Sequence, residues 1–270
     1  MTSAVTLLGV PWDDQSSFLR GAAEAPRAIR RALASPSSNM STEDGRELSL
    51  GHNLVDAGDV TLPAGTPAAA ADVITDQALD LLTRGATVIA IGGDHAITYP
   101  LVRAHARRFP GLAILHLDAH PDFYDDFEGQ PYSHASAFAR IMEAGLALRL
   151  VQVGIRTMNG PQRTHLQRFP VEQVNMRDWT GSVDLSFDGP VYLSIDLDVL
   201  DPAFAPGVSH HEPGGLSVRD VLRIVHGFRG RLVGADVVEL NPGRDREGVT
   251  GMVAAKIVKE IAARMLGEGT

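Results

Sequence analysis

The sequence predicts an α/β fold in which helices flank a parallel β-sheet, and three observations lead to this prediction. Apolar segments of four to eight residues, typical of buried strands, alternate along the chain with longer amphipathic segments of helical period. Hydrophobic residues make up 44% of the 270 residues, enough for a sizeable core. Charged and glycine-rich residues follow several apolar segments directly, where the strands of an open parallel sheet present a ligand site.

Strands are expected at the short apolar segments, which are rich in Val, Ile and Leu. These segments are Val5–Val10, Asn53–Ala57, Thr87–Ile91, Ala113–Leu117, Leu148–Val153, Val191–Ile195 and Leu232–Val237. Helices are expected at the amphipathic segments between them. These are Ala25–Ala34, Pro67–Arg84, Tyr99–Phe109, Ala135–Ala144, Ser217–Gly227 and Gly251–Leu266. The Ser-rich stretch from Ser35 to Arg46 lies too early to separate domains, so residues 1–270 are predicted to form one domain.

The composition excludes several classes of protein. No stretch approaches the roughly 20 apolar residues that span a bilayer, and the N-terminus lacks the basic and apolar regions of a secretion signal. The absence of cysteine excludes disulfides, thiolate metal ligands and a cysteine nucleophile. A formal net charge of −9 without any basic run argues against a nucleic-acid partner. These features favour a cytoplasmic protein that binds neither membrane nor nucleic acid.

Charged side chains interrupt the apolar pattern at two predicted strand ends. The segment L-H-L-D-A-H-P-D carries Asp118, His120 and Asp122, and the segment V-Y-L-S-I-D-L-D carries Asp196 and Asp198. Burying an unpaired charge is very costly, so these groups are expected to be paired or to bind a metal. Residues two apart on an extended strand point to the same side, which would direct each set towards one site.

His95 completes this set, because it follows the two glycines of a tight turn after the strand Thr87–Ile91. Four carboxylates and two imidazoles without sulfur suit hard or borderline divalent cations, manganese before zinc. Two such cations would balance the four carboxylates in charge, and a hydroxide bridging them would be a strong nucleophile. Taken singly, the G-G-D-H turn and the D-x-D pair are compatible with a simple turn or a helix cap. Their joint occurrence at strand ends favours a metal centre.

The same motifs resemble those of the ureohydrolase family, the arginases and agmatinases. Three segments match the family signatures in order: G-G-D-H at 92–95, D-A-H-P-D at 118–122 and S-I-D-L-D-V-L-D-P-A-F-A-P-G at 194–207. Three further segments are most similar to plant-type arginases: Y-S-H-A-S-A-F-A-R-I-M-E at 132–143, L-V-Q-V-G-I-R at 150–156 and P-A-F-A-P-G-V-S-H at 202–210. The resemblance covers essentially the whole chain.

The resemblance implies a three-layer α/β/α fold with an eight-stranded parallel sheet and two Mn²⁺ ions per subunit. One ion would be held by His95, Asp118, Asp122 and Asp196, and the other by His120, Asp118, Asp196 and Asp198. The resemblance also implies a homo-oligomer, either a trimer or a hexamer, that acts on a small guanidino compound.

Two further residues match functional positions of the family. Glu239, in D-V-V-E-L-N-P, would bind the planar guanidinium group of the substrate; a helix cap or a surface acid is the alternative reading. His134, in Y-S-H-A-S, matches the residue that delivers a proton to the leaving amine; a helix N-cap neighbourhood around Ser133 is the alternative. Asp122 would ligate one ion and also accept a hydrogen bond from the hydroxide.

The predicted reaction is hydrolysis of the guanidino group of L-arginine to urea and L-ornithine. Agmatine lacks only the α-carboxylate, so it and other guanidino compounds remain alternatives. Candidate donors to that carboxylate are Ser136, Asn159 and His210. Asn159 stands where animal-type arginases carry an aspartate, and Gln130 stands where an asparagine is usual, so recognition of the amino-acid end is left open. A zinc deacetylase of related fold and a catalytically silent metal-binding homologue are the competing classes.

The other histidines are interpreted from their positions. His116 lies one step deeper in its strand than Asp118 and is expected to be a hydrogen-bonded core residue. His210 and His211 are expected on a flexible polar loop at the pocket rim rather than in a further metal site. The rest lie on helices or loops without identifiable partners and are expected at the surface: His52, His105, His165 and His226.

Overall fold

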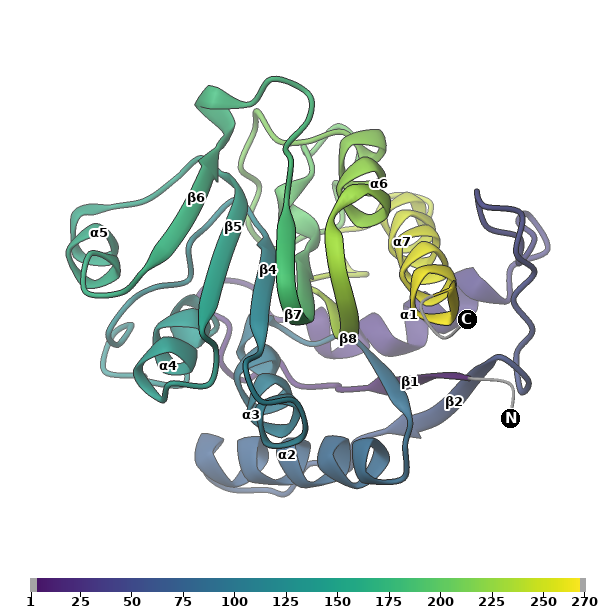
Figure 1. Cartoon of the computed structure of the whole chain (residues 1–270), viewed down its shortest axis with the longest axis horizontal. Helices are drawn as coiled ribbons and strands as arrows, with labels where there is room; N and C mark the ends of the chain where they lie inside the picture. The colour runs from purple at the N-terminus through teal and green to yellow at the C-terminus, as the bar shows by residue number, and fades with distance from the viewer. Residues whose placement is uncertain (1–3, 268–270) are drawn as a thin grey trace.

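Eight parallel strands form one central sheet in the computed structural model, which describes residues 4–267 (Figure 1). The strands are β1 (Val5–Gly9), β2 (Leu54–Asp59), β3 (Thr87–Ile91), β4 (Ala113–Leu117), β5 (Arg149–Ile155), β6 (Val171–Asn175), β7 (Ser186–Asp196) and β8 (Arg229–Val238). Their order across the sheet is β2-β1-β3-β8-β7-β4-β5-β6. The four central strands, β3, β8, β7 and β4, are therefore direct neighbours although they are far apart in the sequence.

Helices cover both faces of this sheet. They are α1 (Ala25–Leu33), α2 (Pro67–Thr83), α3 (Thr98–Arg108), α4 (Ala137–Glu143), α5 (Gly160–Leu166), α6 (Val218–Gly227) and α7 (Val249–Gly267). Helices α1, α6 and α7 pack on one face, and α2, α3 and α4 pack on the other (Figure 1). The predicted fold class, a three-layer α/β/α sandwich with an eight-stranded parallel sheet, is confirmed.

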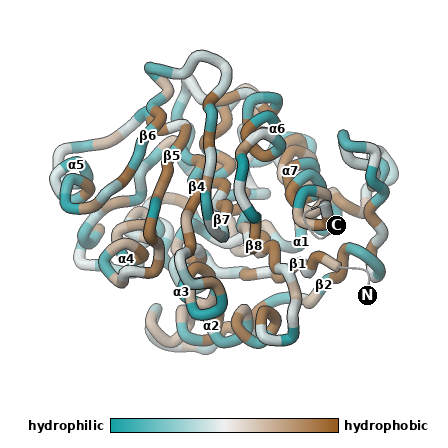
Figure 2. The backbone as a smooth tube through the Cα atoms, in the orientation of Figure 1, coloured by the Kyte–Doolittle hydropathy of each residue, from teal (hydrophilic) through white to brown (hydrophobic). Residues whose placement is uncertain are grey.

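Alternating side chains of the central strands divide the core into two layers. Ile89 of β3 and Leu115 of β4 face the α1, α6 and α7 layer, whereas Val88 and Ile114 face the α2, α3 and α4 layer. Figure 2 accordingly shows hydrophobic residues along much of the central strands. Because both faces are covered, such strands are almost continuous apolar runs, which is why the sequence located them.

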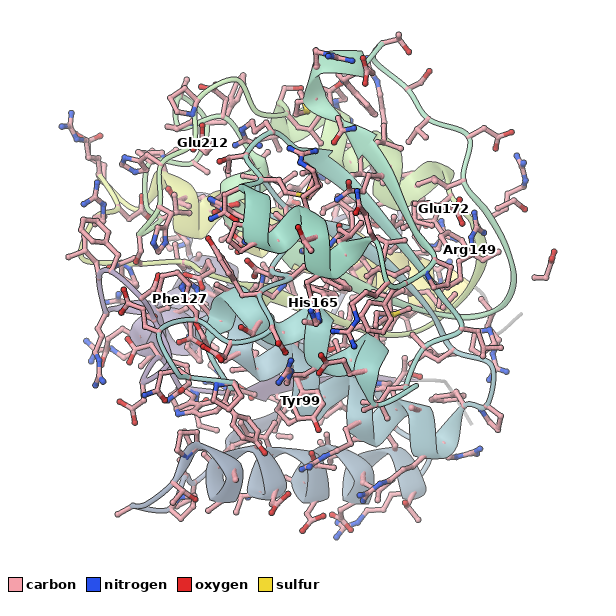
Figure 3. All side chains as sticks on the ribbon, turned by 90° about the vertical axis from the view of Figure 1, so that its left-hand side faces the viewer. Tyr99, Phe127, Arg149, His165, Glu172 and Glu212 are labelled. Carbon is pink, nitrogen blue, oxygen red and sulfur yellow. The ribbon has the colours of Figure 1, made fainter. Side chains whose placement is uncertain are left out.

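The structure contains one strand and one helix to which no segment had been assigned. Strand β6, V-E-Q-V-N, is a partly exposed edge strand. Its polar residues interrupt the apolar pattern by which the other strands were recognised. Arg149 of β5 binds the carboxylate of Glu172 on β6 through two hydrogen bonds of 2.7 and 2.9 Å (Figure 3). Helix α5 has only seven residues, and its signals are local: Asn159 caps it and Pro161 lies in its first turn.

Two histidines predicted at the surface are buried instead. His105 lies between α3 and the sheet, where its Nδ1–H donates to the carbonyl oxygen of Leu101 at 2.8 Å and burial lowers its pKa to about 4. Gly234 of β8 makes room for it, since a Cβ there would lie 2.1 Å from its Nε2. His165 of α5 is 6% exposed and packs against the ring of Phe169. The other two of this group are exposed as predicted: His52 and His226.

Arg156, which directly follows β5, joins three segments of the chain. Its guanidinium donates to the carbonyl oxygens of Glu212 at 2.6 and 2.9 Å and of Asp198 at 2.6 Å. Further bonds of 3.2 Å reach the carbonyls of Gly154 and Val199. One half-buried cation therefore holds the backbone that follows β7.

Replacing Arg156 by alanine is expected to lower the free energy of unfolding by about 2–4 kcal/mol, because several carbonyls lose their donor in a partly buried place. The measurement is chemical denaturation followed by circular dichroism. Arg163→Ala is the matched control, since Arg163 is exposed and donates one bond of 3.3 Å to Met158; its effect should stay within about 0.5 kcal/mol. Equal losses in the two variants would contradict the assigned role of Arg156.

Candidate metal centre

The predicted ligands lie at the carboxyl ends of neighbouring central strands. His95 follows β3, Asp118, His120 and Asp122 follow β4, and Asp196 and Asp198 end or follow β7. Glu239 directly follows β8, which lies between β3 and β7. Parallel strands bring their carboxyl ends to one edge of the sheet, and the structure brings all of these residues together there.

The turn after β3 depends on Gly92 and Gly93. Their φ angles are 85° and 79°, in the region that favours glycine. A Cβ at Gly92 would lie 2.2 Å from Cδ of Pro26, and one at Gly93 would lie 2.7 Å from the carbonyl oxygen of Trp12. The close approach of these segments leaves His95 fully buried.

The aspartates reach the site through turns and not through the strand alternation that the sequence suggested. Strand β4 ends at Leu117, and Asp122 has a left-handed φ of 47°. Asp198 lies in a 3-10 turn, Leu197–Val199, and its N–H donates to the carboxylate of Asp196 at 2.8 Å. Residues two apart on a strand are separated by about 6.6 Å, too far to share one cation easily, whereas a turn folds them together.

Three carboxylates surround one imidazole nitrogen at the first cluster. Nδ1 of His95 lies 3.1 Å from Oδ2 of Asp118, 3.0 Å from Oδ2 of Asp122 and 3.2 Å from Oδ2 of Asp196. All four side chains are buried.

A second cluster adjoins the first. Nδ1 of His120 lies 3.0 Å from Oδ2 of Asp198 and 3.4 Å from Oδ1 of Asp118. Asp118 therefore turns one carboxylate oxygen towards each cluster. The Asp118, His120 and Asp198 group meets the distances at which side chains can share a metal ion.

The hydrogen bonds of His95 determine which of its nitrogens carries a proton. Ser194 donates its only hydroxyl proton to Oδ1 of Asp236 at 2.6 Å, so its oxygen must accept from Nε2–H of His95 at 2.9 Å. In the neutral ring Nδ1 is then a lone pair that faces only the acceptor oxygens of the first cluster, and without a metal these oxygens favour a proton there. Nδ1 has no hydrogen-bond partner among the described residues. A cation at this point satisfies every one of these acceptors, so the residues fit a bound metal.

Protons can compensate this charge only in part. Burial acts to lower the pKa of His95, but the carboxylates around it, Asp118 foremost, raise that pKa well above its usual value. Burial together with the charges of Asp198 and Asp118 raises the pKa of Asp196 well above its usual range, and burial raises that of Asp198 to about 6. Divalent cations would take the place of these protons, so metal binding is expected to release protons.

A second series of hydrogen bonds, which runs through Gln152 and His116, orients Asp118. Nε2 of Gln152 donates to the carbonyl of Pro121 at 2.8 Å and to Nδ1 of His116 at 3.0 Å. His116 therefore carries its proton on Nε2 and donates it to Oδ2 of Asp118 at 2.8 Å. Its ring stacks on Phe138 with centroids 3.7 Å apart. His116 is a hydrogen-bonded core residue, as the sequence predicted.

A pocket of about 240 Å³ opens over the two clusters. Four of the predicted ligands lie in its wall, together with residues of the surrounding loops. The lining residues are Ser17, His120, Asp122, Tyr124, Phe127, His134, Ala135, Thr157, Asn159, Gln162, Asp196, Asp198, His210 and Glu239.

Glu239 and His134 form a buried pair in this pocket. Oε1 of Glu239 accepts from Nδ1–H of His134 and from the backbone N–H of His95, both at 2.9 Å. Oε2 has no hydrogen bond to any described residue. The backbone of Glu239 has a left-handed φ of 66°, a strained conformation for a residue with a side chain. The helix-cap and surface-acid readings of Glu239 do not fit this position.

His134 is held from its other side by Ser17. The backbone N–H of Ser17 donates to Nε2 at 3.1 Å, and the Ser17 hydroxyl lies 2.8 Å from the same nitrogen. Burial acts to lower the pKa of His134, but Glu239 outweighs it and raises the pKa to about 9. The N–H of Ser17 opposes that rise, because a proton on Nε2 would face another donor. His134 is thus oriented at both nitrogens.

The predicted rim residues are only partly in place. Asn159 and His210 line the pocket, whereas His211 turns away and contacts the carbonyl of Pro206 at 2.7 Å. The prediction that Ser136 lies at the rim is wrong: its side chain is fully buried, and its hydroxyl has no partner among the described residues. The reason is local, since His134–Ser136 form a 3-10 turn that directs the third residue into the core.

Sequence reasoning missed several residues of the pocket wall. Ser17 lies in the loop after β1, and Thr157 in the loop after β5, so their position after a strand was the available signal. Tyr124 lies two residues after Asp122 and could have been found from that spacing. Gln130, whose identity had raised a question about substrate recognition, lines a larger neighbouring cavity instead.

A buried cage of carboxylates and imidazoles beside a free acid and a histidine suits a metal-dependent hydrolase. The chain belongs to the arginase family, whose family model matches residues 3–263. It is 48% identical to arginase 1, mitochondrial, of Arabidopsis thaliana over 97% of this chain and 81% of that protein. It is 36% identical to an agmatinase of Neisseria meningitidis over 94% of this chain and 85% of that protein. The solved arginase of Medicago truncatula superposes with a TM-score of 0.92 at 44% identity, over 98% and 88% of the two chains.

The predicted family is confirmed, but the prediction of a cytoplasmic protein is wrong. Plant relatives at 48% identity carry names that place them in mitochondria, or in chloroplasts and mitochondria. The absence of cysteine does not distinguish the cytosol from the interior of an organelle, which explains the error. None of the helices within residues 4–267 has the length and apolar character that crossing a bilayer requires.

Replacing Ser194 by alanine is expected to weaken Mn²⁺ binding about 10- to 100-fold, because His95 loses the partner that fixes its tautomer and orientation. The measurement is titration of Mn²⁺ into metal-free protein by calorimetry. Ser186→Ala is the control, since Ser186 is exposed on the same strand. Unchanged affinity in the Ser194 variant would show that the hydrogen bond does not support the metal centre.

Proposed function

We propose that the protein is a binuclear manganese amidinohydrolase that converts L-arginine to urea and L-ornithine. The observation that carries the proposal is that Nδ1 of His95 faces a buried cage of three carboxylates, beside the pocket that holds Glu239 and His134. Membership of the arginase family supports this class of reaction.

The two ions are assigned to the two clusters. His95, Asp118, Asp122 and Asp196 would hold one ion, and His120, Asp118, Asp196 and Asp198 would hold the other. Oxygen and imidazole ligands without sulfur suit Mn²⁺ before Zn²⁺. When bound, the ions would lower the pKa of a water molecule, so that it could lose a proton and attack a guanidino carbon near neutral pH.

Glu239 is assigned to the guanidinium group. It is buried beside the clusters but belongs to neither, and its Oε2 is left without a partner among the described residues. A planar cation that donates to this oxygen would be oriented above the metal ions by a charge-assisted hydrogen bond. Asp122, which lies in the pocket wall, would orient the attacking water while it ligates one ion.

His134 is assigned to the proton that the leaving amine requires. Its Nδ1–H is fixed on Glu239, so Nε2 is the nitrogen that exchanges a proton within the pocket. An imidazole is suited to gaining and losing a proton near neutral pH. Departure of the amine then separates urea from ornithine.

L-Arginine is proposed over agmatine because the plant relatives at 45–48% identity are named arginases, whereas the agmatinase relative is 36% identical. Agmatine is the second candidate on the basis of that agmatinase. A homo-oligomer, trimer or hexamer, built from a single-domain chain is part of the same proposal. The zinc deacetylase and the silent homologue are disfavoured, since all six predicted ligands, Glu239 and His134 meet in one site.

The deciding experiment measures urea release by the Mn²⁺-loaded protein from a panel of guanidino compounds. The expected result is a higher kcat/KM for L-arginine than for agmatine, with two manganese ions per chain by elemental analysis. A higher kcat/KM for agmatine would overturn the choice of substrate only. No urea from any compound, or one tightly bound ion per chain, would overturn the proposed function itself.

Two substitutions should separate metal binding from proton delivery. Asp196→Ala is expected to abolish urea release and to lower manganese content, because this carboxylate is assigned to both ions. His134→Ala is expected to lower kcat at least about 100-fold with manganese content unchanged, because it removes only a general acid. Asp188→Ala, an exposed position on the strand of Asp196, is the control for lost charge. A metal-depleted His134 variant would contradict its role.

A further inference from the structure

A second group of side chains that can bind a metal lies outside the metal centre, where α4 meets α5. It consists of Asp125 in the loop after β4, Glu143 at the end of α4 and His165 in α5 (Figure 3). One nitrogen or oxygen atom of each side chain lies within 4.8 Å of the others, close enough to share a cation. The proposed function makes no use of these three residues.

His165 distinguishes this group from an ordinary set of surface acids. Its side chain is 6% exposed and packs against the rings of Phe123 and Phe169. Its Nε2 lies 3.0 Å from Oε1 of Glu143, yet it makes no hydrogen bond to any described residue. The distance would allow such a bond, so Oε1 must lie well off the direction of the ring N–H. A buried nitrogen in this position needs another partner.

The same geometry occurs at the metal centre. Nδ1 of His95 lies 3.0 to 3.2 Å from carboxylate oxygens and likewise has no hydrogen bond within the described part of the chain. Two ligand atoms that each lie about 2.1 Å from one zinc ion are about 3.0–3.4 Å apart, and the ion itself occupies the axis of the nitrogen. The spacing of His165 and Glu143 is therefore that of two ligands of one ion.

Arg140 of α4 holds the carboxylates without taking the place of such an ion. Its Nη2 lies 2.7 Å from Oε2 of Glu143 and 3.2 Å from Oδ1 of Asp125. Oε1 of Glu143, the oxygen nearest His165, can therefore bind an ion while Oε2 stays on Arg140. Hydrogen bonds of this kind orient the carboxylate ligands of metal sites. Two carboxylates and one guanidinium also leave one negative charge, which favours a cation.

Arg168 opposes the binding of an ion. Its Nη1 lies 3.3 Å from Nδ1 of His165, so a neutral ring carries its proton on Nε2 when no ion is bound. Binding would move this proton to Nδ1, and Arg168 would have to turn away. Because Arg168 is exposed, that movement meets little resistance, and Nε2 gains the partner that it lacks.

We propose that Asp125, Glu143 and His165 form a third metal site, which takes a zinc ion. One imidazole and two carboxylates are ligands that Zn²⁺ accepts, with water to complete the coordination, and such a set binds Zn²⁺ more tightly than Mn²⁺. The ion would tie α5 to α4 and to the loop after β4. Since Gln162 of α5 lines the catalytic pocket, zinc would stabilise one wall of that pocket.

The first test measures bound zinc in the wild-type protein and in Asp125→Asn. The side chain of Asp125 is 72% exposed, so this change removes a ligand without loss of packing. Each Mn²⁺-loaded protein is dialysed against a series of buffered Zn²⁺ concentrations, and zinc and manganese per chain are determined by elemental analysis. Zinc that replaces manganese in the metal centre is common to both proteins. The wild type is expected to bind about one further zinc per chain, with an affinity at least about 10-fold higher than in the variant.

Asp76→Asn is the matched control, because Asp76 is an exposed acid on α2, away from this group. It should bind the further zinc as the wild type does. Equal zinc binding by the wild type and Asp125→Asn would overturn the inference.

Two further measurements locate the ion. Anomalous diffraction at the zinc edge should show a peak bonded to Nε2 of His165, whereas zinc at the metal centre alone would overturn the inference. Amide hydrogen exchange in α5 should slow about 10-fold on addition of Zn²⁺ to the wild type and stay unchanged in Asp125→Asn. Equal protection of α5 in both proteins would also contradict the site. None of these measurements depends on urea release, so failure of the proposed function would leave this inference standing.

Discussion

The mutual repulsion of four buried carboxylates is the constraint on which the rest of this structure depends. Asp118, Asp122, Asp196 and Asp198 are each at most 6% exposed and lie in contact with two imidazoles. Such a group of like charges is stable only with cations between its members. Bringing the carboxylates together requires β7 and β4 to be neighbours, and β3 and β8 place His95 and Glu239 beside them. Such a central group of parallel strands in turn requires helices on both faces of the sheet.

The groups beneath the clusters show how the fold supports this arrangement. Asp236 is fully buried, yet it accepts from three hydroxyls, those of Thr98, Tyr192 and Ser194. Ser194, oriented by its bond to Asp236, in turn accepts from Nε2–H of His95 and orients that ring. Because these residues belong to the packed centre of the sheet and to α3, the geometry of the metal centre is set by the hydrophobic core and not by mobile loops.

The parts predicted from the sequence are those in which the physical signal is local and strong. Strands buried on both faces are apolar runs, and charges such as Asp118 and Asp196 at their ends are conspicuous. The edge strand β6 and the short helix α5 have neither an apolar run nor conspicuous charges at its end. Ser136 was misplaced because spacing along the chain does not tell which way a 3-10 turn directs a side chain. His105 is buried because Gly234, distant in sequence, leaves space for it, and single-chain patterns carry no such information.

The capping of α5 by Asn159 has a consequence for the dynamics of the pocket. A seven-residue helix is well below the length of about 12–15 residues at which isolated helices become even marginally stable, so α5 depends on its cap and on the packing of His165. Segments of this kind open at a lower free energy than the sheet on which the metal centre is built. The rim of the pocket can therefore fray and re-form while the catalytic floor stays rigid. The pocket therefore joins a wall of low local stability, at α5, to a floor that the central sheet holds in place.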